Sequence, residues 1–186
     1  MANIVEELTG ALESVVSGAG DVVSTTRNVA KDNIVGMLRA GGDVAGASLG
    51  IVSQVVSSGV SAVSQVGGSV TGGAKGLVSG TVSAVAEVGG DVGEAALEAS
   101  RGAVKGASSV GADLGEVAVS AVEGALHAAG EIGGDSGQLA TKAVLGTLHA
   151  ADEIGSEAGS VVRKALLNAA ALPHDVIDAL LTGKTE

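Results

Sequence analysis

The stretch Val88-Gly89-Gly90-Asp91-Val92-Gly93-Glu94 returns at a fixed interval of 22 residues through most of the chain. It recurs as Ile132-Gly133-Gly134-Asp135-Ser136-Gly137-Gln138, and in looser form from Val110 and from Ile154. The unit at Gly41 is four residues longer than the others. A repeat of this length indicates one recurring structural unit. With Gly89 as position 1, the units begin at Ala19, Gly41, Gly67, Gly89, Gly111, Gly133 and Gly155.

Apolar or small residues occupy the same positions in each unit. At about 100° per residue, these positions lie within an arc of roughly 140° on one face of a helix. Strand alternation does not fit the pattern, so the sequence predicts an all-α fold. In the unit that begins at Gly111, the residues of this face are Gly111, Leu114, Gly115, Ala118, Ala121, Val122, Ala125, Leu126, Ala129 and Ile132.

Two helical architectures fit this periodicity. Because 22 is twice 11, the repeat is a hendecad pattern, which predicts long amphipathic helices packed as a coiled coil or helical bundle. The four-residue insertion favours this architecture, since four residues are close to one helical turn. In the alternative, each Gly-Gly pair is a corner, and Asp91 with Glu94 has the spacing of a capping box. That alternative gives an up-and-down bundle of helices of about 19 residues. We favour the long helices.

The chain divides into a repeat region and a short C-terminal segment. The tandem repeats cover residues 1–172, and Pro173 ends them because proline is poorly tolerated inside a helix. Residues 173–186 are expected to form a short cap helix and a tail. Within the repeats, residues 44–86 are rich in Gly, Ser and Val, and Lys75 is their only charged residue.

Composition excludes several classes of protein. The chain has 31 Gly and no aromatic residue, and its mean hydropathy of +0.47 is too high for a disordered tail. A net charge of −11 disfavours nucleic acid as a partner. The absence of Lys and Arg before Arg27 argues against a secretory signal peptide, so we expect a cytoplasmic or membrane-associated protein.

Side chains that carry chemistry are few. His127 and His149 each precede a glutamate by four residues, but such a pair supplies fewer ligands than the three or four of a metal site. The Gly- and Ser-rich segments lack the spacing of phosphate-binding loops. We therefore expect no enzymatic activity and no catalytic residues. We also expect no cofactor, no metal and no small-molecule substrate.

The candidate binding residues are glycines spaced four residues apart. Glycine at this spacing flattens a helix so that another backbone can come close. Each glycine costs about 0.5–1 kcal/mol relative to alanine, which calls for an offsetting contact. We expect a structural protein that self-associates into an oligomer or filament through these glycines. The alternative is a membrane-associated or membrane-inserted helical protein that uses residues 44–86, with lipid as partner. The glycines are Gly42, Gly46, Gly50, Gly68, Gly72, Gly76 and Gly80.

The repeat also resembles known sequence classes. Its Val-Gly-Gly, Ala-Val-x-Gly-Ala and Gly-Glu-Ala elements over residues 8–172 resemble hydrophobic, Gly- and Ala-rich hendecad coiled-coil proteins of prokaryotes. Residues 60–74 look like the central region of the synucleins, which, like apolipoproteins, use 11- or 22-residue repeats to lie on lipid. The chain differs from the lipid-binding class because it lacks regular Lys beside the apolar face and is strongly negative.

Overall fold

The computed structural model of the chain describes residues 21–40 and 49–177 except Asp175, together with Leu181 and four isolated residues near the N-terminus. These described residues contain helices and no strand, which confirms the all-α prediction. The isolated residues are Glu6, Thr9, Gly10 and Glu13. The helices are α2 (Val22–Ala40), α3 (Leu49–Gln65), α4 (Val70–Glu87), α5 (Val92–Val110), α6 (Leu114–Ile132), α7 (Ser136–Ile154) and α8 (Ser156–Asn168).

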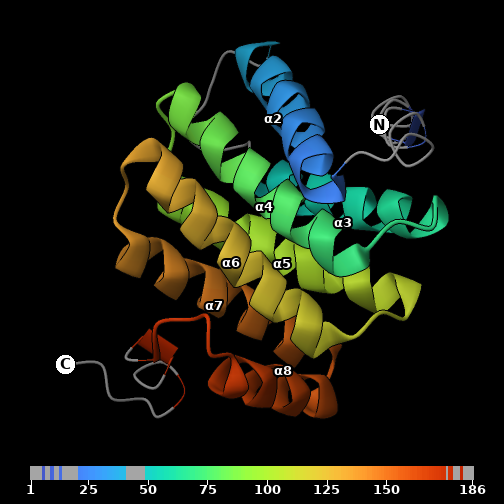
Figure 1. Cartoon of the computed structure of the whole chain (residues 1–186), viewed down its shortest axis with the longest axis vertical. Coiled ribbons are helices and arrows are strands. Elements are labelled where there is room, and N and C mark those ends of the chain that lie inside the picture. The colour runs from blue at the N-terminus through green and yellow to red at the C-terminus, as the bar shows by residue number, and fades with distance from the viewer. Residues whose placement is uncertain are drawn as a thin grey trace.

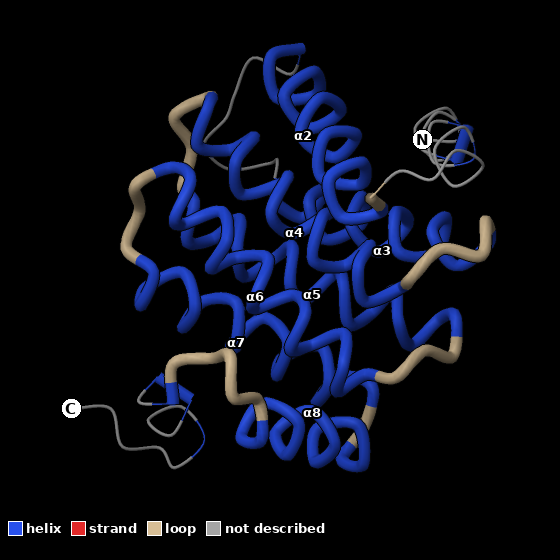
Figure 2. Tube along the Cα trace, viewed as in Figure 1, coloured by secondary structure: helices blue, strands red, loops and turns tan. Residues whose placement is uncertain are grey.

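The helices are stacked in two layers (Figure 1). One layer contains α2, α4, α6 and α8, and the other contains α3, α5 and α7, so that helices two places apart in the chain lie side by side. Neighbours within a layer run parallel, because the contacts between α4 and α6 keep a constant sequence separation. Lys75 meets Glu123, and Ser79 meets His127, each pair being 48 residues apart. From α3 to α8, successive helices are antiparallel and joined by tight turns (Figure 2).

The prediction of long helices running through the glycine pairs is wrong. Each unit is one helix followed by one turn, and α5, α6 and α7 are 19 residues long, as the alternative architecture requires. The reason is the backbone conformation of the first glycine in each turn. Gly89 has a φ of 75° and Gly111 a φ of 70°, a left-handed conformation that ends a helix and that glycine adopts at little cost.

Hydrogen bonds close the turn between α4 and α5 on both sides. The N–H of Gly90 donates to the Val85 carbonyl at 2.9 Å, as in a Schellman motif. The carboxylate of Asp91 then accepts from the N–H groups of Gly93 and Glu94, at 2.9 and 3.0 Å, and so begins α5. The Gly-Gly-Asp signature is therefore a helix stop followed immediately by a helix start.

The four-residue insertion lies in a connection and does not extend a helix, contrary to the prediction. Contacts between α3 and α5 join residues 49 apart, such as Ser53 and Gly102, whereas those between α2 and α4 join residues 53 apart, such as Arg27 and Gly80. The extra residues therefore fall between α2 and α3. That connection, residues 41–48, lies outside the described residues.

The charge-poor region is explained by burial within the chain. Its second half forms α4, which contacts α2, α3, α5 and α6 and buries twelve of its eighteen residues. Charged side chains would lose their hydration in such a position. Among the described residues, no helix is both long enough and apolar enough to cross a membrane.

Mainly Ala and Val side chains fill the space between the layers. Among them, Val78, Val104 and Val122 are completely buried. Residues that follow α8 also contribute to this core. Beyond α8, Leu172 and Ile177 are also buried, and the N–H of Ile177 donates to the Pro173 carbonyl at 3.3 Å.

Glycine at position 14 sets the spacing within each layer. There it faces the main chain of the helix two places earlier, and a Cβ atom at Gly124 would lie 2.5 Å from the carbonyl oxygen of Lys75. No side chain fits at that distance, so the two backbones are in direct contact. The equivalent pairs are Gly80 with Arg27, Gly102 with Ser53, and Gly146 with Leu97.

Two alanine substitutions in α6 separate this packing role from the intrinsic cost of glycine. Gly124→Ala should lower the free energy of unfolding by about 1–3 kcal/mol, because the added methyl group overpacks the contact with Lys75. Gly130, in the same helix, has open space around it. Gly130→Ala should therefore raise stability by up to about 1 kcal/mol. Urea unfolding followed by circular dichroism measures both, and equal effects would contradict the packing role.

The aspartate caps should each contribute to stability. The Asp113 carboxylate accepts from the N–H of Glu116 at 2.9 Å. Asp113→Ala removes this acceptor and should lower the free energy of unfolding by about 1 kcal/mol, whereas Asp113→Asn keeps an acceptor and should change it little. Thermal melts of the two variants make the comparison, and equal losses would show that the hydrogen-bond acceptor is not the source of the stabilisation.

Candidate functional site

The glycines predicted for self-association lie in different environments. Gly76 and Gly80 are buried in α4 and face α2 of the same chain, where a Cβ at Gly76 would meet the main chain at Val23. Their close backbone contact is therefore made within one molecule.

The other glycines of this set do not form a common surface. Gly50 is exposed at the start of α3 with open space around it, and Gly68 lies in the turn between α3 and α4. Gly72 is half-buried in α4 beside Val23. Gly42 and Gly46 lie outside the described residues.

An apolar surface at the C-terminal end of the stack is the feature that the sequence analysis missed. Val161 and Leu167 of α8 are 44% and 42% exposed, and Ile154 at the end of α7 is 41% exposed. Val161 stands at position 7 of its unit, where Val117 and Leu139 of earlier units are completely or almost completely buried. Position 7 lies on nearly the same side of a helix as position 14, which faces the preceding helix of the layer, and Val161 accordingly lies beside Gly115 of α6. Its exposure therefore reflects an incomplete contact between α6 and α8, the last helix in its layer among the described residues.

The sequence carried a signal for this surface. Position 7 is apolar in the unit that begins at Gly155, as it is in the units that begin at Gly111 and Gly133. We call this surface the end face and define it by Ile154, Glu157, Ser160, Val161, Lys164 and Leu167, all of which are exposed.

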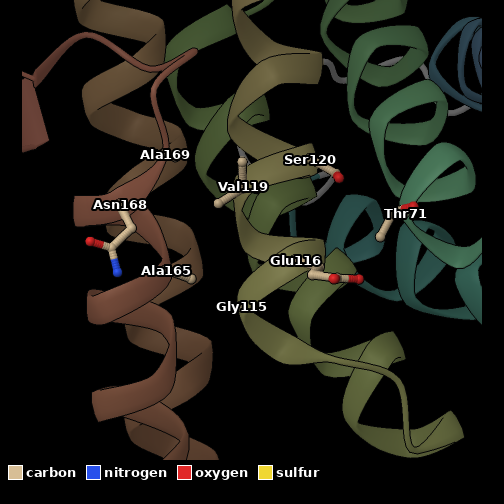
Figure 3. A pocket seen from close by; sticks show the side chains of 8 residues that line it. All are labelled: Thr71, Gly115, Glu116, Val119, Ser120, Ala165, Asn168 and Ala169. Carbon is tan, nitrogen blue, oxygen red and sulfur yellow. The ribbon is translucent and has the colours of Figure 1, made fainter.

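A groove of about 430 Å³ lies beside the end face, along α6 and α8 (Figure 3). Gly115 and Val119 of α6 line it together with Ala165 of α8 and Ala169, the residue that follows α8. The two helices touch only because Gly115 has no side chain, since a Cβ there would lie 2.7 Å from the Cβ of Ala165. The polar residues of the groove are Thr71 of α4, Glu116 and Ser120 of α6, and Asn168 of α8.

Asn168 accounts for this groove. It stands at position 14, where α4, α5, α6 and α7 have glycine. Gly146 meets a residue 49 places earlier, and the residue 49 places before Asn168 is Val119, which lines the groove with it. A residue with a Cβ atom cannot make the backbone contact that glycine makes at this position, so α6 and α8 do not close here and Asn168 lines the groove.

A second hollow, of about 500 Å³, lies at the turn between α7 and α8. Leu114, Ile154 and Val161 supply its large apolar side chains, and Glu157 is also part of its wall. The turn differs from the earlier ones because Gly155, with φ 154° and ψ 167°, leads directly into α8. Glu157 stands at position 3, which is occupied by the capping aspartate in α5, α6 and α7.

Ion pairs join neighbouring helices of a layer at the surface, but not at the end face. Lys142 pairs with Glu94 at 2.5 Å, at a separation of 48 residues. The same separation would join Lys164 to Glu116, yet neither of these residues has an ion pair in the part of the chain that the structure describes, and nor does Glu157. The end face therefore carries an unpaired acid and an unpaired base beside its apolar side chains.

Glu131 and Glu153, which follow His127 and His149 by four residues, form ion pairs with basic residues. Arg27 binds Glu131, while Arg101 and Lys105 bind Glu153, with Lys105 at 2.7 Å. Within the described residues, no three His, Cys, Asp or Glu side chains lie close enough together to hold a metal ion.

Basic neighbours lower the pKa of two carboxyl groups. The pKa of Glu87 is lowered by a hydrogen bond from Lys31 and by the charge of that lysine. The pKa of Glu153 is lowered first by its hydrogen bond from Lys105, against a smaller opposing effect of burial. Both carboxylates bind basic side chains of the preceding helix in their layer, so their ionisation contributes to cohesion between helices.

Comparison with known proteins adds one structural likeness. No protein-family model matches the sequence, and no curated protein matches it. Among solved structures, the chain is similar to a de novo designed helical repeat protein, DHR7, with 16% sequence identity and a TM-score of 0.36. The match covers 84% of this chain and 97% of the designed chain.

Stability should depend on pH through these two glutamates. Their lowered pKa values stabilise the folded state above the ordinary value of 4.5, and this contribution is lost as the pH falls through the lower folded values. The melting temperature should therefore fall on acidification below about pH 5, and less steeply after Glu87→Gln with Glu153→Gln. Glu116→Gln is the control, because Glu116 has no ion pair among the described residues. Identical slopes for all three proteins would contradict the assignment.

Proposed function

We propose that this protein is a non-enzymatic structural protein whose folded stack associates with copies of itself. The observation that carries the proposal is the exposure of Val161 at a position that inner units bury. Stacks of helical repeats remain monomeric when their terminal helices present a polar outer face. The last helix, α8, presents Val161 and Leu167 to solvent instead.

The composition of the end face is suited to contact with protein. Its apolar side chains are flanked by the charged Glu157 and Lys164, and small residues line the groove beside it. Protein interfaces have this arrangement of an apolar centre with a polar rim. Both hollows lie open at the surface of the stack, so a second folded body has access to them.

The opposite end of the same layer is polar. The outer side of α2 exposes Ser24, Asn28 and Asp32, which cap the stack as terminal repeats of solenoids do. In this layer the exposed apolar side chains are therefore at the C-terminal end, where we place association; Ile51, which is exposed on α3, belongs to the other layer.

The mass of the full chain in detergent-free buffer tests this proposal. Light scattering after size-exclusion chromatography should give a mass that rises above 17.6 kDa with increasing concentration. Val161→Glu with Leu167→Glu should return the mass to that of the monomer without loss of helicity, since both side chains are exposed. Ile51→Glu is the matched control, because Ile51 is 42% exposed on α3 at the other end. A mass of 17.6 kDa at every concentration would refute self-association.

A further inference from the structure

We propose that two copies pair through α8 in an antiparallel arrangement around a two-fold axis, with Glu157 of each copy binding Lys164 of the other. The inference rests on the proposed self-association and specifies its geometry. Two observations support the pairing. The end face is symmetric, and its charged residues Glu157 and Lys164 have no ion pair among the described residues of one chain.

The end face is symmetric about the midpoint between Ser160 and Val161. Glu157 and Lys164 lie equally far from this midpoint on either side of it. In an antiparallel pair of identical helices, each residue faces the one equally far beyond the midpoint. Acid then meets base twice, as the self-complementarity of a two-fold interface requires.

These residues also lie on one side of α8. At about 100° per residue, positions 157 to 167 of the end face fall within an arc of roughly 120°. Ile154 precedes the helix but lines the same hollow as Glu157 and Val161, which places it at the edge of this surface. The facing residues can therefore be in contact at the same time.

Pairing gives Glu157 and Lys164 the ion-pair partners that they lack among the described residues of one chain. Lys164 does not reach Glu116, because Asn168 keeps α8 away from α6. Charge complementarity across an interface fixes register and disfavours other alignments. A contact between two helices of 13 residues lies below the usual 1,200–2,000 Å² of stable complexes, so the dimer should depend on concentration.

Head-to-tail stacking of one copy on another is disfavoured by α2. A second copy would have to place α2 against α8, as α4 lies against α2 within the chain. Position 14 of α2 is the exposed Asp32, whereas α4 has Gly80 at that position. The free energy needed to bury the Asp32 carboxylate without a partner would exceed the free energy gained from the contact between α2 and α8.

Charge reversal tests the pairing. Sedimentation velocity of the full chain should show a monomer–dimer equilibrium. Glu157→Lys alone and Lys164→Glu alone should each weaken dimerisation by about tenfold or more, because like charges then face each other twice. The protein carrying both substitutions should recover the dimer. An equimolar mixture of the two single variants should form a heterodimer, because all four charges are then complementary.

A cysteine cross-link gives a second readout. The chain has no cysteine, so Ser160→Cys introduces a single thiol next to the proposed axis. Mild oxidation should yield a covalent dimer on a non-reducing gel. Ser24→Cys, exposed on α2, should remain monomeric under the same conditions.

The outcomes separate the two proposals. A dimer that both single charge reversals leave intact would overturn the α8 pairing while preserving self-association. Absence of any dimer in the unsubstituted chain would overturn both. Growth beyond a dimer that Asp32→Lys alters would overturn the two-fold pairing in favour of head-to-tail stacking.

Discussion

Direct backbone contact between neighbouring helices of a layer is the constraint on which the structure depends. The chain has no aromatic side chain, so its core consists of small residues, and helices must come close together to exclude water. Glycine at position 14 makes this approach possible, as at Gly124 against Lys75. Where Asn168 replaces that glycine, the contact opens into a groove. This substitution is one of the features that distinguish α8 from the inner helices.

The two ends of the stack follow from the same arrangement. In a stack of repeats each helix is stabilised by its immediate neighbours, so α2 and α8, the outermost described helices of their layer, each keep a face that no described helix covers. On α2 this face is polar and includes Asp32, whereas the exposed residues of α8 include Val161 and Leu167. Ion pairs of the kind made by Lys142 and Glu94 join the inner helices, whereas Lys164 and Glu157 make no ion pair among the described residues.

Much of the local structure was predictable from the sequence, and the errors have a physical cause. The Gly-Gly-Asp signature contains the stop and start signals of helices. The alternative prediction, an up-and-down bundle with a corner at each Gly-Gly pair, interpreted these signals correctly. The preference for long helices relied on the constant phase of the apolar face. That constancy has another explanation, because each unit occupies an equivalent place in the stack and must present the same positions to the core. The glycine ladder at Gly76 and Gly80 does lie against another backbone, but that backbone is α2 of the same chain.

The sequence by itself determined where helices begin and end and which side of each is apolar, because caps and periodicity act over one or two turns. Only the tertiary structure decided that each helix lies beside the one two places earlier, since that choice depends on the direction of every turn and on contacts about 50 residues apart. The same choice decides the environment of position 7. It is buried at Val117 and exposed at Val161, because α8 lies less closely against α6, the preceding helix of its layer, than the inner helices lie against theirs.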